Sequence, residues 1–393
     1  MTASDGLLFD IGERSDPSHA RYGEDSFAFM NRVDQPFWER IRDELERWFA
    51  EYPQPHAADL RARFRNSAPA QHFPAWWELY LHRLFNRLGF MVEVHPELPG
   101  RSARPDFRLV RGADNFLVEA ATTFSGIVDP ERHGTRENWI MAAIDEARNP
   151  DFFVGLRFDR VGRERPTVRE ITGPLERWLT SLDADEVIAA GAKVREQLHL
   201  EVRDWSLVLT AIPRSPAKRG KHGRLLGVGP GMTGPVNDVE MLRRTLERKR
   251  RVYGRPNEPI VVAVLLVSGF VDNEDIEQAL FGSIAWQYSP QAPDSGRWVR
   301  RRNGFWVQGT RARGTRVSAV LTACVMAHNA ASVWPRLWPN PWATRPLTAS
   351  LPFPAAAPDQ DGVMAYESAS GTPAALLGVP EDWPGPEAPF AKH

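Results

Sequence analysis

The chain has 393 residues, of which 42% are hydrophobic and 25% are charged, and its formal net charge is −1. This composition is typical of a globular protein of about two or three domains, and it excludes a fibrous or low-complexity chain. The balanced charge gives no overall positive field, no apolar run is long enough to span a membrane, and Cys324, the single cysteine, excludes an internal disulfide and a cysteine zinc site.

The N-terminal part of the chain is predicted to be helical. Apolar side chains recur at helical spacing in three segments, residues 37–52, 57–65 and 74–88. Gly89 follows the last segment and is a typical helix terminator, while Pro74 suits its first turn. We assign residues 1–70 to an N-terminal helical segment. Its start has no secretory signal, so we expect a cytoplasmic protein.

Three short strands are predicted after the third helix. They cover residues 90–95, 106–111 and 115–123. Gly112-Ala113-Asp114 between the last two is a hairpin turn signal, so we expect these two strands to pair antiparallel. The segment 74–123 is therefore predicted to run helix, strand, strand, turn, strand.

Two interpretations of the following chain remain open, because either of two helix–strand pairs can complete this core. In the first, the helix at 239–253 and the continuous apolar strand at 259–267 follow, and residues 124–235 form a large insertion. In the second, the helix at 138–148 and the strand at 152–158 take those places. We assign residues 71–270 to the core with its insertion.

Residues 271–393 form a third, C-terminal region. Late strands are predicted at 305–307 and 316–326. From Trp334 onward, Pro, Trp, Ala and Gly dominate, which predicts mostly loop. We therefore expect a β-containing region followed by a tail that wraps onto the body of the protein.

Three carboxylates mark a candidate site within 74–123. Glu78 lies on the helix, Asp106 opens the second strand, and Glu119 lies in the third. A turn at Gly112 sets Asp106 across from Glu119. Carboxylates with a backbone carbonyl, such as that of Ala120, are ligands that Mg²⁺ takes, and such a metal can activate water and stabilise charge on a phosphate.

Each acid also has a structural explanation. Glu119 can pair with one of many arginines, Asp106 follows a proline as turn residues do, and Glu78 can belong to a solvated helix face. The order and spacing of the three together favour a functional site.

The segment 74–123 resembles the PD-(D/E)XK, or restriction-endonuclease-like, nuclease superfamily, including a bacterial branch of it. The resemblance covers about fifty residues and is carried by Glu78-Leu79-Tyr80-Leu81-His82, Leu88-Gly89-Phe90, His95-Pro96-Glu97, Pro105-Asp106 and Val118-Glu119-Ala120. It implies an α/β fold with an αβββαβ core, in which helices flank a mixed central sheet. It also implies Mg²⁺ (or Mn²⁺), phosphodiester hydrolysis, Asp106 and Glu119 as metal ligands and Glu78 in support. A restriction or phage-defence role follows only by analogy of fold.

The chain departs from this superfamily at the motif lysine. The position two residues after the second acid is Ala121, which cannot activate water or offset transition-state charge. Lys249 is the candidate replacement, because the first interpretation lets it reach the site from its helix. The second interpretation offers only Arg136 and Arg148. The alternative for Lys249 is one more charge on a solvated helix face.

Ala121 also supports a second functional hypothesis. The chain would then be a catalytically inactive protein with the nuclease fold, acting as a nucleic-acid- or protein-binding module. Three carboxylates held together favour the enzyme, because their mutual repulsion costs stability without a cation.

Basic residues provide candidate contacts to phosphates. The candidates are Lys218, Lys221, Arg248, Arg300 and Arg301. Trp298 and Trp306 lie near the last two and offer rings that can stack on bases. The alternative is that arginine is simply frequent here and balanced by acids. We expect nucleic acid as the partner, DNA in preference to RNA, and no membrane; a homodimer or an unidentified protein partner is also compatible.

Overall fold

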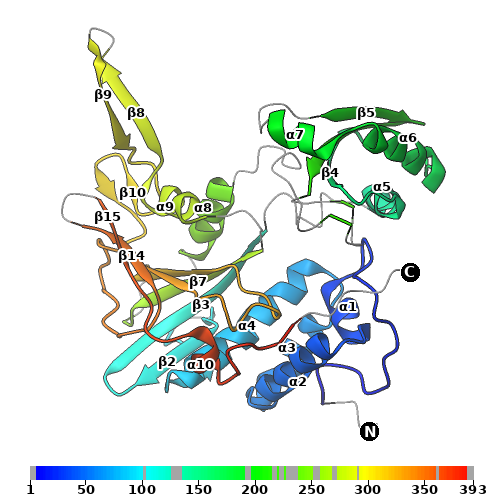
Figure 1. Cartoon of the computed structure of the whole chain (residues 1–393). Coiled ribbons are helices and arrows are strands. Elements are labelled where there is room, and N and C mark those ends of the chain that lie inside the picture. The colour runs from blue at the N-terminus through cyan, green and yellow to red at the C-terminus, as the bar shows by residue number, and fades with distance from the viewer. Residues whose placement is uncertain are drawn as a thin grey trace. The chain divides into compact units, whose positions relative to one another are not determined.

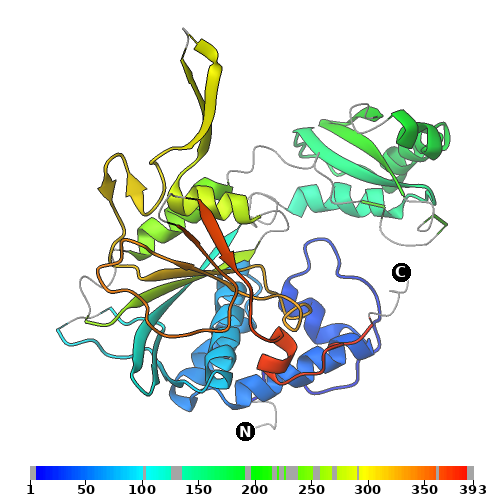
Figure 2. The same cartoon turned by 60° about the vertical axis from the view of Figure 1, so that its left-hand side comes forward.

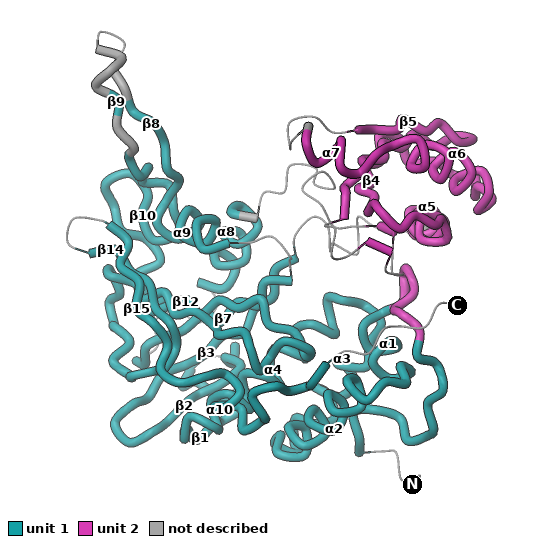
Figure 3. Tube along the Cα trace, viewed as in Figure 1, with its two compact units in different colours: residues 1–17, 25–125, 237–389 teal, residues 18–24, 126–236, 390–393 magenta. Residues whose placement is uncertain are grey.

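The computed structural model describes residues 6–100, 103–124, 135–190, 196–214, 219–220, 225–226, 238–250, 257–267, 272–289, 292–359 and 363–386. The chain forms two compact units (Figure 3). The first unit comprises residues 1–17, 25–125 and 237–389, and the second comprises residues 18–24, 126–236 and 390–393. Each unit has a hydrophobic core of its own.

The first unit contains an eight-stranded sheet with helices on both faces (Figures 1 and 2). Its helices are α1 (Ser26–Arg32), α2 (Pro36–Ala50), α3 (Gln54–Phe64), α4 (Pro69–Arg87), α8 (Asp238–Lys249), α9 (Asn273–Phe281) and α10 (Pro373–Leu377). The sheet strands are β1 (Met91–Val94), β2 (Phe107–Arg111), β3 (Asp114–Phe124), β7 (Ile260–Val267), β12 (Ala319–Ala323), β13 (Arg336–Pro339), β14 (Ala355–Pro358) and β15 (Met364–Glu367). Two further hairpins are formed by β8 (Ile284–Ser289) with β9 (Ala292–Arg300) and by β10 (Val307–Gln308) with β11 (Arg311–Ala312).

The sheet is mixed, in the order β1-β2-β3-β7-β12-β13-β14-β15. Strands β1, β2 and β3 pair antiparallel, whereas β7 runs parallel to both β3 and β12. All eight residues of β7 are buried, as expected for a strand covered on both faces. An α/β fold with a mixed central sheet flanked by helices is therefore confirmed. The strand that pairs with β3 opposite β2 is β7, and helix α8 precedes it. The helix–strand pair predicted at 138–158 does not take these places.

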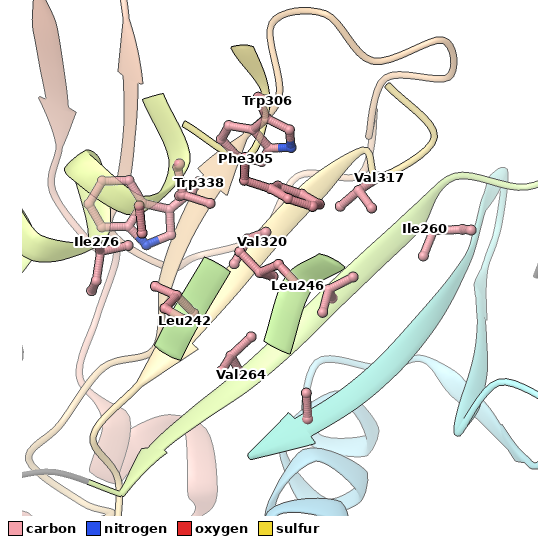
Figure 4. Packing of buried hydrophobic residues seen from close by; sticks show 14 of the residues in the cluster. Leu242, Leu246, Ile260, Val264, Ile276, Phe305, Trp306, Val317, Val320 and Trp338 are labelled. Carbon is pink, nitrogen blue, oxygen red and sulfur yellow. The ribbon is translucent and has the colours of Figure 1, made fainter. Parts of the chain in front are cut away.

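Helices pack on the two faces through different residues. On one face, the Trp77 indole of α4 donates a hydrogen bond to the Ala263 carbonyl of β7 at 2.9 Å. On the other face, Leu242 and Leu246 of α8 join a core cluster that includes Val264 and Val320 (Figure 4). The sheet is thus buried on both sides around β3 and β7.

The elements differ from the predicted ones mainly where periodicity is weak. Helix α4 begins at Pro69, so Pro74 lies inside the helix instead of in its first turn. The region after Trp334 is not only loop, because β13, β14 and β15 extend the central sheet. These strands have four residues each, too few for an alternating pattern to be detected. The β8–β9 hairpin, which extends away from the sheet in Figures 1 and 2, was also not predicted.

The second unit is a smaller α/β structure. Its elements are α5 (Thr135–Glu146), β4 (Phe152–Arg160), α6 (Val168–Thr180), α7 (Ala184–Ala190), β5 (Gln197–Val202) and β6 (Trp205–Pro213). The three strands pair antiparallel in the order β4-β6-β5. Ile171, Leu175 and Trp205 are fully buried in its core. In neither unit does the described part of the chain include a helix that is long and apolar enough to cross a membrane.

Candidate active site

The β2–β3 hairpin brings Asp106 and Glu119 to facing positions. Gly112 takes a left-handed φ of 59° in the two-residue turn, a conformation that glycine adopts without strain. Phe107 pairs with Val118, so Asp106, one residue before, stands across from Glu119, one residue after. The Asp106 carboxylate accepts a hydrogen bond from the Ala120 N–H at 2.7 Å.

Asp106 lies in surroundings that disfavour its negative charge. Burial is the main cause, and the charges of Glu119 and Glu78 add to it, so the pKa of Asp106 is raised well above its usual range. The Lys249 ammonium and the Ala120 N–H oppose this shift only in part. The Glu119 carboxylate therefore lies close enough to Asp106 to disfavour its charged form.

Lys249 reaches Glu119 from α8. Its Nζ lies 2.5 Å from Glu119 Oε1, and the Glu119 side chain is only 5% exposed. The helix places it there because Leu242, Leu246 and Lys249 follow the i, i+4, i+7 spacing of one helix face. The two leucines pack on the sheet, so the lysine meets the sheet one turn later.

Ala121 occupies the motif lysine position as a core residue. It is 6% exposed and belongs to the same hydrophobic cluster as Leu242 and Leu246. Glu119 and Ala121 are two residues apart on one strand and so project to the same face of the sheet. That face is covered by α8, and the ammonium group beside Glu119 comes from this helix.

Glu78 lies near the two strand acids, but its carboxylate already forms an ion pair with an arginine. Both of its carboxylate oxygens accept hydrogen bonds from Arg63 of α3, at 2.8 and 2.7 Å. Arg63 also contacts Asp59 at 2.8 Å. Such a bidentate pair fixes the direction of the Glu78 carboxylate and neutralises its charge. Arg63 was not predicted, because one arginine among many carries no signal of its partner.

Tyr52 is a second residue that the sequence analysis missed. Its hydroxyl is buried and has no hydrogen-bond partner among the described residues. Burial, followed by the charge of Glu78, raises the pKa of Tyr52, and Asp106 adds to the shift. Tyr52 therefore lies near the acids Glu78 and Asp106 of the candidate site. Its position at the end of the first predicted helix gave no indication of this.

Two of the three acids have the oxygen ligands that a divalent cation requires and are not held by an arginine. Asp106 and Glu119 offer the carboxylate oxygens that Mg²⁺ or Mn²⁺ takes, and the crowding of negative charge that raises the Asp106 pKa is what a cation relieves. Glu78 is held by Arg63. In the described ranges, no three His, Cys, Asp or Glu side chains are grouped so that they can hold a metal. The residues therefore fit an ion carried by two carboxylates, with the remaining positions left to water or a phosphate oxygen.

The predicted nucleic-acid contacts that fall within the described residues lie on separate elements of the first unit. Arg300 bonds Glu277 at 3.0 Å, and Arg248 contacts the Thr245 hydroxyl at 3.3 Å. Arg301 is exposed. Trp306 is fully buried, so the prediction that it stacks on bases is wrong. Lys218, Lys221 and the side chain of Trp298 lie outside the described residues.

The comparisons with known proteins add no family to this geometry. No family model, no curated protein and no solved structure matches the chain. What remains to indicate a function is the set of residues at the site and the order of the elements that carry them.

Proposed function

We propose that the protein is a metal-dependent nuclease that hydrolyses phosphodiester bonds, with DNA as the favoured substrate over RNA. The observation that carries this proposal is the grouping of Asp106, Glu119 and Lys249. Two carboxylates and an ammonium group, drawn from a hairpin and a distant helix, meet at one buried point. A structural ion pair would need only one of these carboxylates.

The order of elements supports the same proposal. Helix α4, strands β1, β2 and β3, helix α8 and strand β7 follow one another in the first unit in the αβββαβ order of the superfamily that the sequence resembles. Asp106 directly precedes the second of these strands and Glu119 lies on the third, as the resemblance to that superfamily implies, and the lysine is supplied by helix α8.

Each residue has a defined part in the proposed chemistry. Asp106 and Glu119 would hold a Mg²⁺ ion, which lowers the pKa of bound water and stabilises charge on a phosphate. Lys249 presents a positive charge beside Glu119, where it can hold an attacking water and offset negative charge that develops on the phosphate. Arg63 keeps the Glu78 carboxylate fixed next to this group.

Cleavage assays test the proposal. Plasmid, linear duplex, single-stranded DNA and RNA would be incubated with the wild type in Mg²⁺, Mn²⁺ or EDTA. We expect metal-dependent cleavage, which Asp106→Asn lowers by at least about 100-fold because one of the two charged ligands is lost. Glu93→Gln is the matched control, since Glu93 is a half-exposed carboxylate on neighbouring β1. Equal activity of wild type and Asp106→Asn would contradict the proposal.

One observation favours a second candidate function. Ala121 at the motif lysine position is compatible with an inactive protein that keeps the fold as a nucleic-acid- or protein-binding module. This candidate predicts that DNA binds without cleavage in any metal, and that Lys249→Ala leaves binding unchanged. The same assays, combined with a binding measurement, therefore separate the two functions.

A further inference from the structure

A pocket lined by arginines lies at the end of α8. Its volume is about 430 Å³, and its described lining residues include Arg250, Arg313, Thr315 and Arg316. Of the described lining residues, three are arginines and none is acidic. We call this the arginine pocket. Two of these arginines, Arg313 and Arg316, were not among the predicted nucleic-acid contacts.

The loop that forms one wall of the arginine pocket is held firmly by its backbone. Gly314 has a left-handed φ of 57°, and a Cβ atom there would lie only 3.2 Å from the rings of Phe305 and Trp306. The Arg313 N–H donates to the Trp306 carbonyl at 2.7 Å, and the Thr344 N–H donates to the Thr315 carbonyl at 2.7 Å. The arginines on this loop are therefore presented from a fixed backbone, which lowers the entropic cost of binding.

Glu247 lies close to the arginine pocket. It accepts a hydrogen bond from Arg250 at 2.5 Å and lies 3.9 Å from Arg313. This one carboxylate is shared by two guanidinium groups and cannot by itself neutralise both. Arg316 is exposed and lines the same pocket.

The chemistry of the lining selects an anionic ligand of a particular kind. Guanidinium groups bind phosphate oxygens through paired N–H donors, and the Thr315 hydroxyl adds a donor for a neighbouring oxygen. A volume of about 430 Å³ exceeds what a bare phosphate needs and suits a phosphate with part of its sugar. The ligand class is thus a phosphate ester.

The arginine pocket is adjacent to the candidate active site through the chain itself. Arg250 directly follows Lys249, and consecutive Cα atoms lie about 3.8 Å apart. The distance between the arginine pocket and the Lys249–Glu119 pair is therefore at most the length of two side chains plus one Cα–Cα distance. We propose, on the basis of the function proposed above, that the arginine pocket binds a backbone phosphate of the nucleic acid close to the bond that is cleaved.

Binding measured without cleavage tests this inference. Fluorescence anisotropy of a labelled DNA duplex, in EDTA and over a range of salt concentrations, would compare the wild type with Arg316→Ala. We expect a Kd about five- to tenfold weaker and a slope of log K against log salt lower by about 0.9, the value for one lost phosphate contact. Arg316 is exposed, and a melting temperature close to that of the wild type would show that the variant folds.

Arg244→Ala is the matched control. Arg244 lies on the same helix as Lys249, is 74% exposed and pairs with Glu240, so its removal changes the net charge equally. Less than about a twofold change in Kd is expected, since no phosphate contact is lost. Equal losses for Arg244→Ala and Arg316→Ala would overturn the inference, because the effect would then be general electrostatics.

A second arm distinguishes the sources of the phosphate. Inorganic phosphate and a mononucleotide would compete against the labelled duplex. Weak competition, with affinity that rises with oligonucleotide length, supports a backbone contact. Saturable binding of the mononucleotide without binding of the duplex would overturn it in favour of a free-nucleotide site. If DNA is not cleaved but Arg316→Ala still weakens DNA binding, the proposed nuclease function is refuted and the inference about the arginine pocket is retained.

Discussion

Asp106 is a carboxyl group held where its charge is unfavourable, and this has a measurable effect on stability. Its raised pKa means that the folded protein keeps this proton to a higher pH than the unfolded chain does. The contribution of Asp106 to the free energy of unfolding is therefore largest below its ordinary pKa and falls as the pH rises through the raised value. A substitution that removes the Asp106 charge should therefore remove this fall in the free energy of unfolding at high pH.

The substitution Asp106→Asn tests that expectation in metal-free protein. The new amide oxygen can still accept the Ala120 N–H, so the hairpin contact is retained. In EDTA, urea unfolding should show the Asp106→Asn variant to be more stable than the wild type at about pH 8 by at least about 1 kcal/mol, since one pKa unit corresponds to about 1.4 kcal/mol. The difference should shrink toward about pH 4. A difference that does not change with pH would show that Asp106 does not titrate in this range.

Residue-level prediction succeeded where local geometry is sufficient. The facing positions of Asp106 and Glu119 follow from the turn at Gly112, because a two-residue turn sets the register of both strands. Arg63 and Tyr52 could not be found in this way. Their contacts join different elements, and nothing in the local sequence indicates which of many arginines meets which acid.

At the scale of elements, α8 shows how a helix can deliver a charge to a sheet. Its apolar row ends in Lys249, so the helix that completes the core also completes the candidate site. This row was readable in the sequence. The pairing of β7 with β3 was only one of two alternatives in the sequence, and the fold shows that these two strands meet across the insertion.

Variants of Lys249 separate a catalytic part from a structural one. Lys249→Met should lower kcat about 100-fold with little change in KM, and it should also destabilise the protein by about 1–3 kcal/mol, because Glu119 loses its ammonium partner. Lys249→Arg should recover most of the stability but not the rate, since the larger, planar guanidinium group does not place its charge where the compact ammonium group does.

A double variant provides the control for this prediction. Lys249→Met combined with Glu119→Gln removes both charges and should restore stability without restoring cleavage. Chemical denaturation and steady-state kinetics would be measured on the same preparations. Full activity in Lys249→Met would show that the ion pair is structural only.

At the scale of the whole molecule, the second unit has the features of an independently folding part. Its core contains Ile171, Leu175 and Trp205, which are all fully buried. Its strands β4, β6 and β5 form a separate three-stranded sheet. A unit with its own core is expected to fold alone. The C-terminal strands β13–β15 differ in this respect, because they extend the sheet of the first unit.

Expression of residues 126–236 alone tests this expectation. The fragment should unfold in one cooperative thermal transition, followed by the near-ultraviolet circular dichroism of its tryptophans, Trp139, Trp178 and Trp205. It should be less stable than a fragment joined to residues 18–24, because the Tyr22 hydroxyl bonds Asp145 at 2.6 Å within this unit. A gradual loss of signal without a transition would contradict independent folding.

The separation of Glu119 and Lys249 in the sequence also affects the order of events during synthesis. They are 130 residues apart, and at translation rates of about 5–20 residues per second the lysine emerges several seconds after the acid. In that interval β3 has only β2 as a partner, and its other edge stays open until β7 is made. Collapse of the intervening chain into the second unit shortens the tether between the two halves and so lowers the entropic cost of closing them. The buried charges therefore meet late, after most of the first unit's helices and the whole insertion have been synthesised.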